Sequence, residues 1–263
     1  LCMCLMQRAV VVMPDEAQAT RMKQDLISFG INALHYPARD FSFRTSEIAS
    51  REYEHRRLLV LDKMLSESYD AVVLSAEAAM QLTVPPEKLF RNCFEIVSGK
   101  DYDINDLADR LVKSGYIRSE QVDGAGQFAI RGGILDFFPP DSDRPCRVEF
   151  WGDSVDGIAF FDVETQRRGD NLDRVRITPA REILVPESEL ITIIINHIKE
   201  NRIRGDALKY LNEDLEKLNN GVRLSSVDKY MPLIYPESAS IFSYDRAGIV
   251  PPQNLLLDCL QHD

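Results

Sequence analysis

Residues 115–168 read GYIRSEQVDGAGQFAIRGGILDFFPPDSDRPCRVEFWGDSVDGIAFFDVETQRR and are the most informative part of this chain. Apolar and polar residues alternate along them, which is typical of β-strands because successive side chains point to opposite faces of a sheet. In residues 146–151 this alternation predicts an apolar face made of Cys146, Val148 and Phe150. The opposite face then carries Arg147, Glu149 and Trp151.

The preceding segment follows the same pattern. In residues 127–131, Phe128 and Ile130 form the apolar pair, which leaves Gln127, Ala129 and Arg131 on the other face. Gly132 and Gly133 allow a bend before the next strand, and Pro139-Pro140-Asp141 and Gly152-Asp153 provide turn residues. We therefore expect a small antiparallel sheet with a solvent-facing side that carries two arginines, a glutamate and a tryptophan.

Two interpretations of that side are open from the pattern alone. Arginine and tryptophan are enriched at the energetic centres of protein interfaces, which favours a binding surface. The alternative is a surface ladder of cross-strand pairs in which a neighbouring loop partly covers Trp151.

The order and spacing of four segments resemble a known domain: GYIR, GQFAIRGGILDFFPP, RVEFWGDSVDGIAFFDVETQRR and ITPAREIL. They are similar to the UvrA-binding domain shared by nucleotide-excision repair proteins. The ending TQRR and the form RGGILDFFP favour the transcription-repair coupling factors over UvrB, the second candidate. The segment KYMPLIYPESASIFSY (229–244) resembles the return segment of the first domain in that family.

The resemblance implies which residues contact UvrA: Arg131, Arg147 and Trp151, followed by Arg118 and Glu149. Most relatives carry phenylalanine at the position of Trp151. The arginines would make charge-assisted contacts with acidic groups of UvrA, and the aromatic ring would be the buried anchor. We expect Arg131→Ala or Arg147→Ala to weaken UvrA binding by about 2 kcal/mol or more. We also expect folding to change little, because both side chains should face solvent.

The resemblance also implies a function. The chain would be the non-catalytic N-terminal, UvrB-like part of a larger cytoplasmic protein that uses ATP and Mg²⁺ to move on DNA. That parent would displace stalled RNA polymerase and recruit UvrA, and its own C-terminal region would cover the UvrA-binding face. No cofactor is expected in this chain itself.

Composition limits the alternatives. With 263 residues, 44% hydrophobic and 28% charged, the chain has the balance of a folded protein of about two domains. Its net charge of −11 argues against autonomous nucleic-acid binding, which relies on cationic side chains. The basic run of Arg51, His55, Arg56 and Arg57 is expected to be a solvated helix face.

The five dispersed cysteines have no zinc-like spacing, so we expect reduced structural thiols. The apolar runs 1–6 and 190–195 are too short to cross a membrane. Because the chain does not begin with methionine, we expect it to be a piece of a longer protein.

The first hundred residues alternate between strands and helices, which predicts a parallel sheet. Strands are expected at 9–13, 33–36, 71–75 and 94–97, and helices at 15–30, 46–65 and 77–82. The predicted fold class is α/β: a degenerate helicase-like domain (1–98) with an inserted antiparallel β-rich domain (99–186). A helical segment and a return to the first domain should follow (187–263).

Two motifs imitate nucleotide-binding sites. Residues 10–18, VVVMPDEAQ, resemble a helicase acidic box, but no Gly-Lys-Ser/Thr phosphate loop accompanies it. Residues 124–129 match a relaxed dinucleotide fingerprint, yet a strand is expected after them where that motif needs a helix. The region between His35 and Ala71 also leaves no room for the DNA-inserting hairpin of UvrB.

Two rival functions remain open. One is an ATP-dependent UvrB-type helicase with damage-binding function, whose phosphate loop would lie upstream of Leu1. The other is a generic α/β scaffold whose arginine face binds some other protein.

Overall fold

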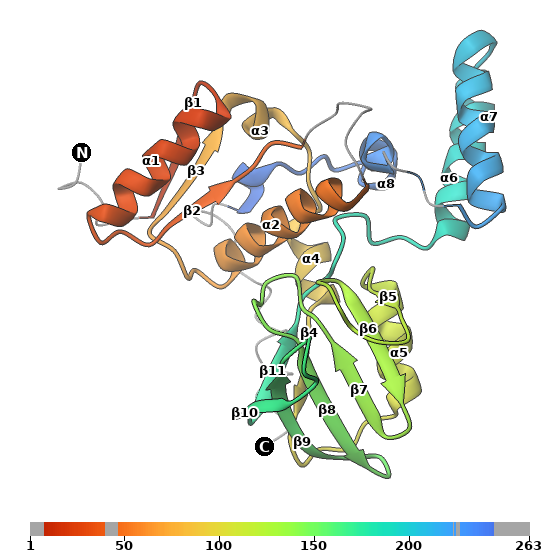
Figure 1. Ribbon diagram of the computed structural model, residues 1–263. Coiled ribbons are helices and arrows are strands. Elements are labelled where there is room, and N and C mark those ends of the chain that lie inside the picture. The colour runs from red at the N-terminus through yellow and green to blue at the C-terminus, as the bar shows by residue number, and fades with distance from the viewer. Residues whose placement is uncertain (1–7, 40–46, 223, 225–226, 245–263) are drawn as a thin grey trace.

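The computed structural model of the protein describes residues 8–39, 47–222, 224 and 227–244 (Figure 1). The strands are β1 (Ala9–Met13), β2 (Ala33–Tyr36), β3 (Ala71–Ser75), β4 (Phe94–Val97), β5 (Ile117–Arg118), β6 (Gln127–Arg131), β7 (Ile134–Phe137), β8 (Cys146–Trp151), β9 (Ser154–Phe161), β10 (Arg168–Leu172) and β11 (Arg174–Ile177). The α-helices are α1 (Glu16–Ser28), α2 (Glu47–Leu65), α3 (Ala76–Met80), α4 (Pro86–Asn92), α5 (Ile104–Lys113), α6 (Glu187–Glu200), α7 (Gly205–Asn219) and α8 (Met231–Ile234). Short 3₁₀ turns occupy Val227–Tyr230 and Ile241–Tyr244.

The first part of the chain is a parallel α/β layer. Its sheet has the order β1-β3-β2, and both pairs are parallel. Strand β3 lies in the middle and is buried along its whole length, which explains its continuous apolar sequence. Asp15 caps α1 by accepting a hydrogen bond from the backbone N–H of Gln18 at 2.8 Å. The predicted helix cap at Asp15 is therefore confirmed.

Strand β4 does not belong to that parallel sheet. It pairs antiparallel with β11 in a separate two-stranded ribbon, with Phe94 opposite Ile177 and Val97 opposite Arg174. The prediction that residues 94–97 complete the parallel set is thus wrong. The reason is long-range: β11 returns some eighty residues later along the chain and offers β4 a partner.

The β-rich part is a six-stranded sheet of order β10-β9-β8-β7-β6-β5. All its pairs are antiparallel except the short pair β5–β6. One face of the sheet packs against α5 through a core that includes Leu111, Phe128, Leu135 and Val148. Asp103 caps α5. The combination of parallel and antiparallel sheets with helices confirms the predicted α/β fold with a β-rich insert.

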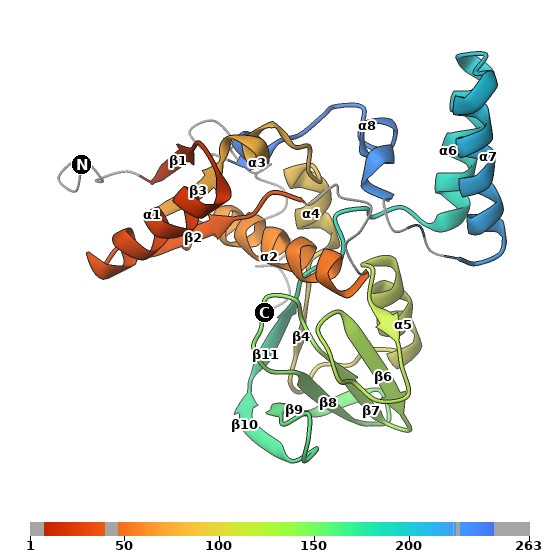
Figure 2. The same ribbon diagram turned by 45° about the horizontal axis from the view of Figure 1, so that its top comes forward.

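The C-terminal segment contacts the first part again. Tyr230, Met231, Ile234 and Tyr244 share a hydrophobic cluster with residues of α2 and β3, and the Tyr244 hydroxyl donates to the Val84 carbonyl at 2.7 Å. Before this return, α6 and α7 form an antiparallel hairpin that projects from the rest of the molecule in both views (Figures 1 and 2).

A buried ionic cluster on α2 joins the first part to the end of the β-rich part. Arg57 and Glu182 are both fully buried, and Arg57 Nε donates to Glu182 Oε1 at 2.8 Å. Arg39 also pairs with this carboxylate, and Thr83 donates to it. The expectation that the basic run 51–57 is a solvated face is therefore wrong for Arg57. Its partner lies 125 residues away in the sequence, so the local pattern could not reveal it.

Candidate arginine-centred interaction face

Strand register places both predicted site arginines on the sheet face opposite the α5 core. In β7, Asp136 lies opposite Ala129 of β6 and opposite Arg147 of β8. Arg131 ends β6 and pairs with Ile134 across a two-residue turn, at which Gly132 has a φ of +61°. A left-handed backbone of this kind favours glycine and closes the hairpin tightly.

Both arginines contact the carboxylate of Asp136. Arg147 donates from Nε to Oδ1 at 2.7 Å and from Nη2 to Oδ2 at 2.9 Å. Arg131 donates from Nη2 to Oδ2 at 2.7 Å. Asp136 is not among the site residues predicted from the sequence, although an acid within the apolar strand ILDFF, on the arginine face, was the available signal.

Arg147 is not on an open, solvent-facing side. Its side chain is only 13% exposed and lies over the ring of Phe161 with its guanidinium 4.5 Å from the ring centroid. Phe161 forms a small second core with Val122 and Ala129, and Phe138 packs against it. The expectation that Arg147 and Ala129 face water is therefore wrong, because loops cover this half of the face.

The charge of the buried Arg147 side chain is paired with that of Asp136. The hydrogen bond to Asp136 raises the pKa of Arg147 above its usual value, with burial acting in the opposite direction. Gln166 adds two further contacts to Arg147: its backbone oxygen accepts from Nη1 at 3.3 Å, and its Oε1 accepts from Nη2 at 3.2 Å. No sequence pattern indicated a role for Gln166, which lies in the turn between β9 and β10.

The other predicted residues are more exposed. Trp151, at the end of β8, is 85% exposed and ranks among the most exposed large apolar residues that the structure describes. Glu149 pairs with Arg168 of β10, which lies over Gly157. Arg118 is exposed on the edge strand β5, and its placement adds no contact to the two arginines on Asp136.

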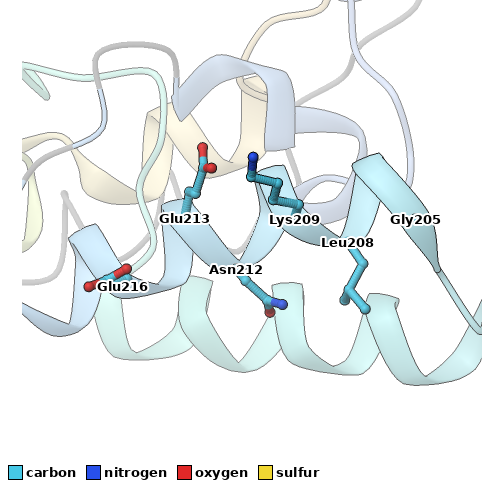
Figure 3. A pocket seen from close by; sticks show the side chains of 6 residues that line it. All are labelled: Gly205, Leu208, Lys209, Asn212, Glu213 and Glu216. Atoms are coloured by element: carbon cyan, nitrogen blue, oxygen red, sulfur yellow. The ribbon is translucent and has the colours of Figure 1, made fainter.

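Few other features of the described residues compete as sites. No group of three or more His, Cys, Asp or Glu residues there is arranged to hold a metal ion. No helix in that same part is long and apolar enough to cross a membrane. Figure 3 shows an open hollow lined by residues of α7 alone: Gly205, Leu208, Lys209, Asn212, Glu213 and Glu216. A hollow built by one helix surface lacks the converging walls of a ligand pocket.

Comparison with known proteins assigns the β-rich part. Residues 94–183 match the family model of the UvrB interaction domain. Over 253 residues the chain is 29% identical to the transcription-repair-coupling factor of Bacillus subtilis, covering 91% of this chain and 21% of that protein. The corresponding protein of Myxococcus xanthus is 33% identical over 184 residues, covering 68% and 15%, respectively. That of Haemophilus influenzae is 28% identical over 250 residues, covering 95% and 21%.

The chain thus spans about a fifth of the length of the curated relatives it matches. The alignments nevertheless cover most of the chain, and they include the parallel α/β layer as well as the β-rich part. The chain belongs to the transcription-repair-coupling factor family, as its N-terminal region, and carries a UvrB interaction domain.

Proposed function

We propose that this chain is a non-catalytic recruitment module that binds UvrA through the outer face of its β-rich part. The observation that carries the proposal is the pair of arginines on a buried acid, on the same sheet as the exposed Trp151. Arginine and tryptophan supply much of the binding energy at protein interfaces. The match of this region to the UvrB interaction domain supports a partner from the same repair system.

The wider role rests on the family. In this proposal the parent protein is a cytoplasmic translocase that uses ATP and Mg²⁺, contacts DNA and stalled RNA polymerase, and brings UvrA to the stalled complex. Its C-terminal region covers the arginine face until that face is needed. The module divides into a helicase-like part (1–98), the UvrA-binding part (99–186) and a returning segment (187–263).

The exposed side chains are the ones to test. Arg131→Ala and Trp151→Ala should each weaken UvrA binding by about 2 kcal/mol, or roughly thirtyfold, as truncation of an interface hot spot does. Arg144 is a matched control because its side chain is 54% exposed, against 45% for Arg131, and it also pairs with an aspartate of the β-rich part. Arg144→Ala should leave the affinity unchanged.

The measurement is a calorimetric titration of UvrA with each purified variant. Equal affinities for wild type, Arg131→Ala and Trp151→Ala would refute the site. Absence of any binding by the wild-type chain would refute the partner.

A further inference from the structure

Arg131 and Arg147 both donate hydrogen bonds to the Asp136 carboxylate. Its side chain is 2% exposed, so a partner protein cannot reach it directly. It sits in the middle of the sheet between β6 and β8, and each of its oxygens accepts at least one hydrogen bond from an arginine. Because a buried carboxylate is costly without such partners, these contacts fix where both guanidinium groups lie.

The two arginines use their donors differently. Arg147 directs Nε, Nη1 and Nη2 to Asp136 and Gln166, so that four of its five N–H donors make intramolecular contacts. The hydrogen bonds that Arg131 makes with described residues all run through Nη2, to Asp136 and more weakly to Gln166 at 3.5 Å. Nε and Nη1 of Arg131 make no hydrogen bond with a described residue, on a side chain that is 45% exposed.

Gln166 accepts hydrogen bonds from both arginines. It has a left-handed backbone with a φ of +58°, and its side-chain amide donates to the Val163 carbonyl at 2.8 Å. This bond turns Oε1 toward the arginines. The turn itself is fixed by Asp162, which accepts from both the N–H and the hydroxyl of Thr165 at 2.7 Å.

We infer that Asp136 is a positioning residue for partner binding. It holds Arg131 through Nη2 and leaves Nε and Nη1 able to donate, and Arg131 rather than Arg147 contacts a carboxylate of the partner. Arg147 supports this arrangement without touching the partner, because it neutralises the Asp136 charge and donates to Gln166. This inference rests on the proposed function and assigns separate roles to two arginines that the family resemblance treats alike. A side chain held in its bound geometry loses less conformational entropy on association.

A double-mutant cycle tests the inference, with UvrA as the probe. Asp136→Asn keeps the shape of the side chain but removes the charge that orients Arg131. We expect it to weaken UvrA binding about tenfold in the wild-type background and by less than twofold in the Arg131→Ala background. Such a loss of effect is the signature of a residue that acts through another.

A second readout reports the positioning directly. The Nε–H of Arg131, followed by nitrogen NMR relaxation in the free chain, should be ordered in the wild type and mobile in Asp136→Asn. Gln166→Ala provides a second variant that does not alter the buried acid, should Asp136→Asn fold poorly. It should weaken binding about threefold, again only when Arg131 is present.

The outcomes are distinguishable. An equal loss of affinity in both backgrounds, or an Arg131 side chain that stays ordered in Asp136→Asn, would overturn the inference while leaving the proposed function intact. So would unchanged UvrA binding by Asp136→Asn or, if that variant is unfolded, by Gln166→Ala. If Arg131→Ala and Trp151→Ala bind UvrA as the wild type does, the proposed site fails, and the inference fails with it.

Discussion

Replacing Glu182 by glutamine removes a buried negative charge from the junction between the α/β layer and the β-rich part. The carboxylate accepts from Arg57 and Thr83 and pairs with Arg39. Arg57 keeps neutral acceptors in the variant, including the Pro37 carbonyl at 3.0 Å and Gln81 Oε1 at 3.1 Å. Its positive charge nevertheless loses its buried counter-charge.

The magnitude follows from the environment of Glu182. Desolvation is the largest single effect and raises the pKa of Glu182. The charges of Arg39 and Arg57, together with the hydrogen bonds from Arg57 and Thr83, outweigh it and lower this pKa from 4.5 to about 2. At about 1.4 kcal/mol for each pH unit, this difference corresponds to about 3 kcal/mol of folding stability. Removal of one partner from a buried ion pair independently suggests about 3–5 kcal/mol. We expect Glu182→Gln to lower the free energy of unfolding by about 3 kcal/mol at pH 7.

The pH dependence has a defined sign. Because the folded pKa of Glu182 is depressed, its contribution is fully present above about pH 4.5 and disappears as the pH falls toward 2. Glu54 acts in the opposite sense: burial and then the Glu182 charge raise its pKa, so proton uptake by Glu54 favours the fold as the pH falls. The difference in the free energy of unfolding between wild type and Glu182→Gln should therefore shrink between pH 4.5 and 2. The same comparison in a Glu54→Gln background removes the opposing effect of Glu54.

The measurement is urea denaturation of wild type and variant, from pH 7 down to the lowest pH at which both are folded. A difference below about 1 kcal/mol at pH 7 would refute the reasoning. A difference that stays constant as the pH falls would refute the assignment of the charge to Glu182.

Two further outcomes concern stability. Arg147→Ala should destabilise the fold by about 2–3 kcal/mol because the buried Asp136 carboxylate loses its contacts with Arg147. Arg131 is more exposed, so Arg131→Ala should cost about 1 kcal/mol or less. Equal losses of stability in urea denaturation would contradict the argument from side-chain burial. Gly115→Ala should cost more than Gly99→Ala in thermal unfolding. Gly99 has a φ of +76° and Gly115 one of +90°, but an added Cβ at Gly115 would lie 2.7 Å from Arg181 Cγ, while Gly99 has open space. Similar melting temperatures would show that Arg181 moves aside freely.

Local patterns predicted most of the secondary structure but not what covers it. Strands 9–13, 33–36 and 71–75 have the predicted bounds because their apolar runs and flanking turn residues are local signals. The same periodicity placed Arg147 on the face opposite Val148, and its ion pair with Asp136 across the strand register agrees with that placement. It could not show that Phe161 and the following turn would cover Arg147.

Long-range partners account for the other errors. The sequence around Phe94 describes a strand equally well whether it joins the parallel sheet or pairs with β11. Arg57 looks like a surface charge until Glu182 is brought beside it by the fold. The roles of Arg131, Arg147, Trp151 and the other site residues in UvrA binding stay predictions.

The ribbon formed by β4 and β11 has a consequence for any force that acts on the β-rich part. One strand leads into the β-rich part and the other leads out, and the two lie side by side (Figure 1). Phe94 and Ile177 are paired at the same end of the ribbon. A load applied to the β-rich part therefore divides between two covalent chains running in the same line. The hydrogen bonds between the strands lie across that line and carry little shear. The ion pair between Arg57 of α2 and Glu182 crosses the same joint, and we expect it to loosen before the six-stranded sheet deforms.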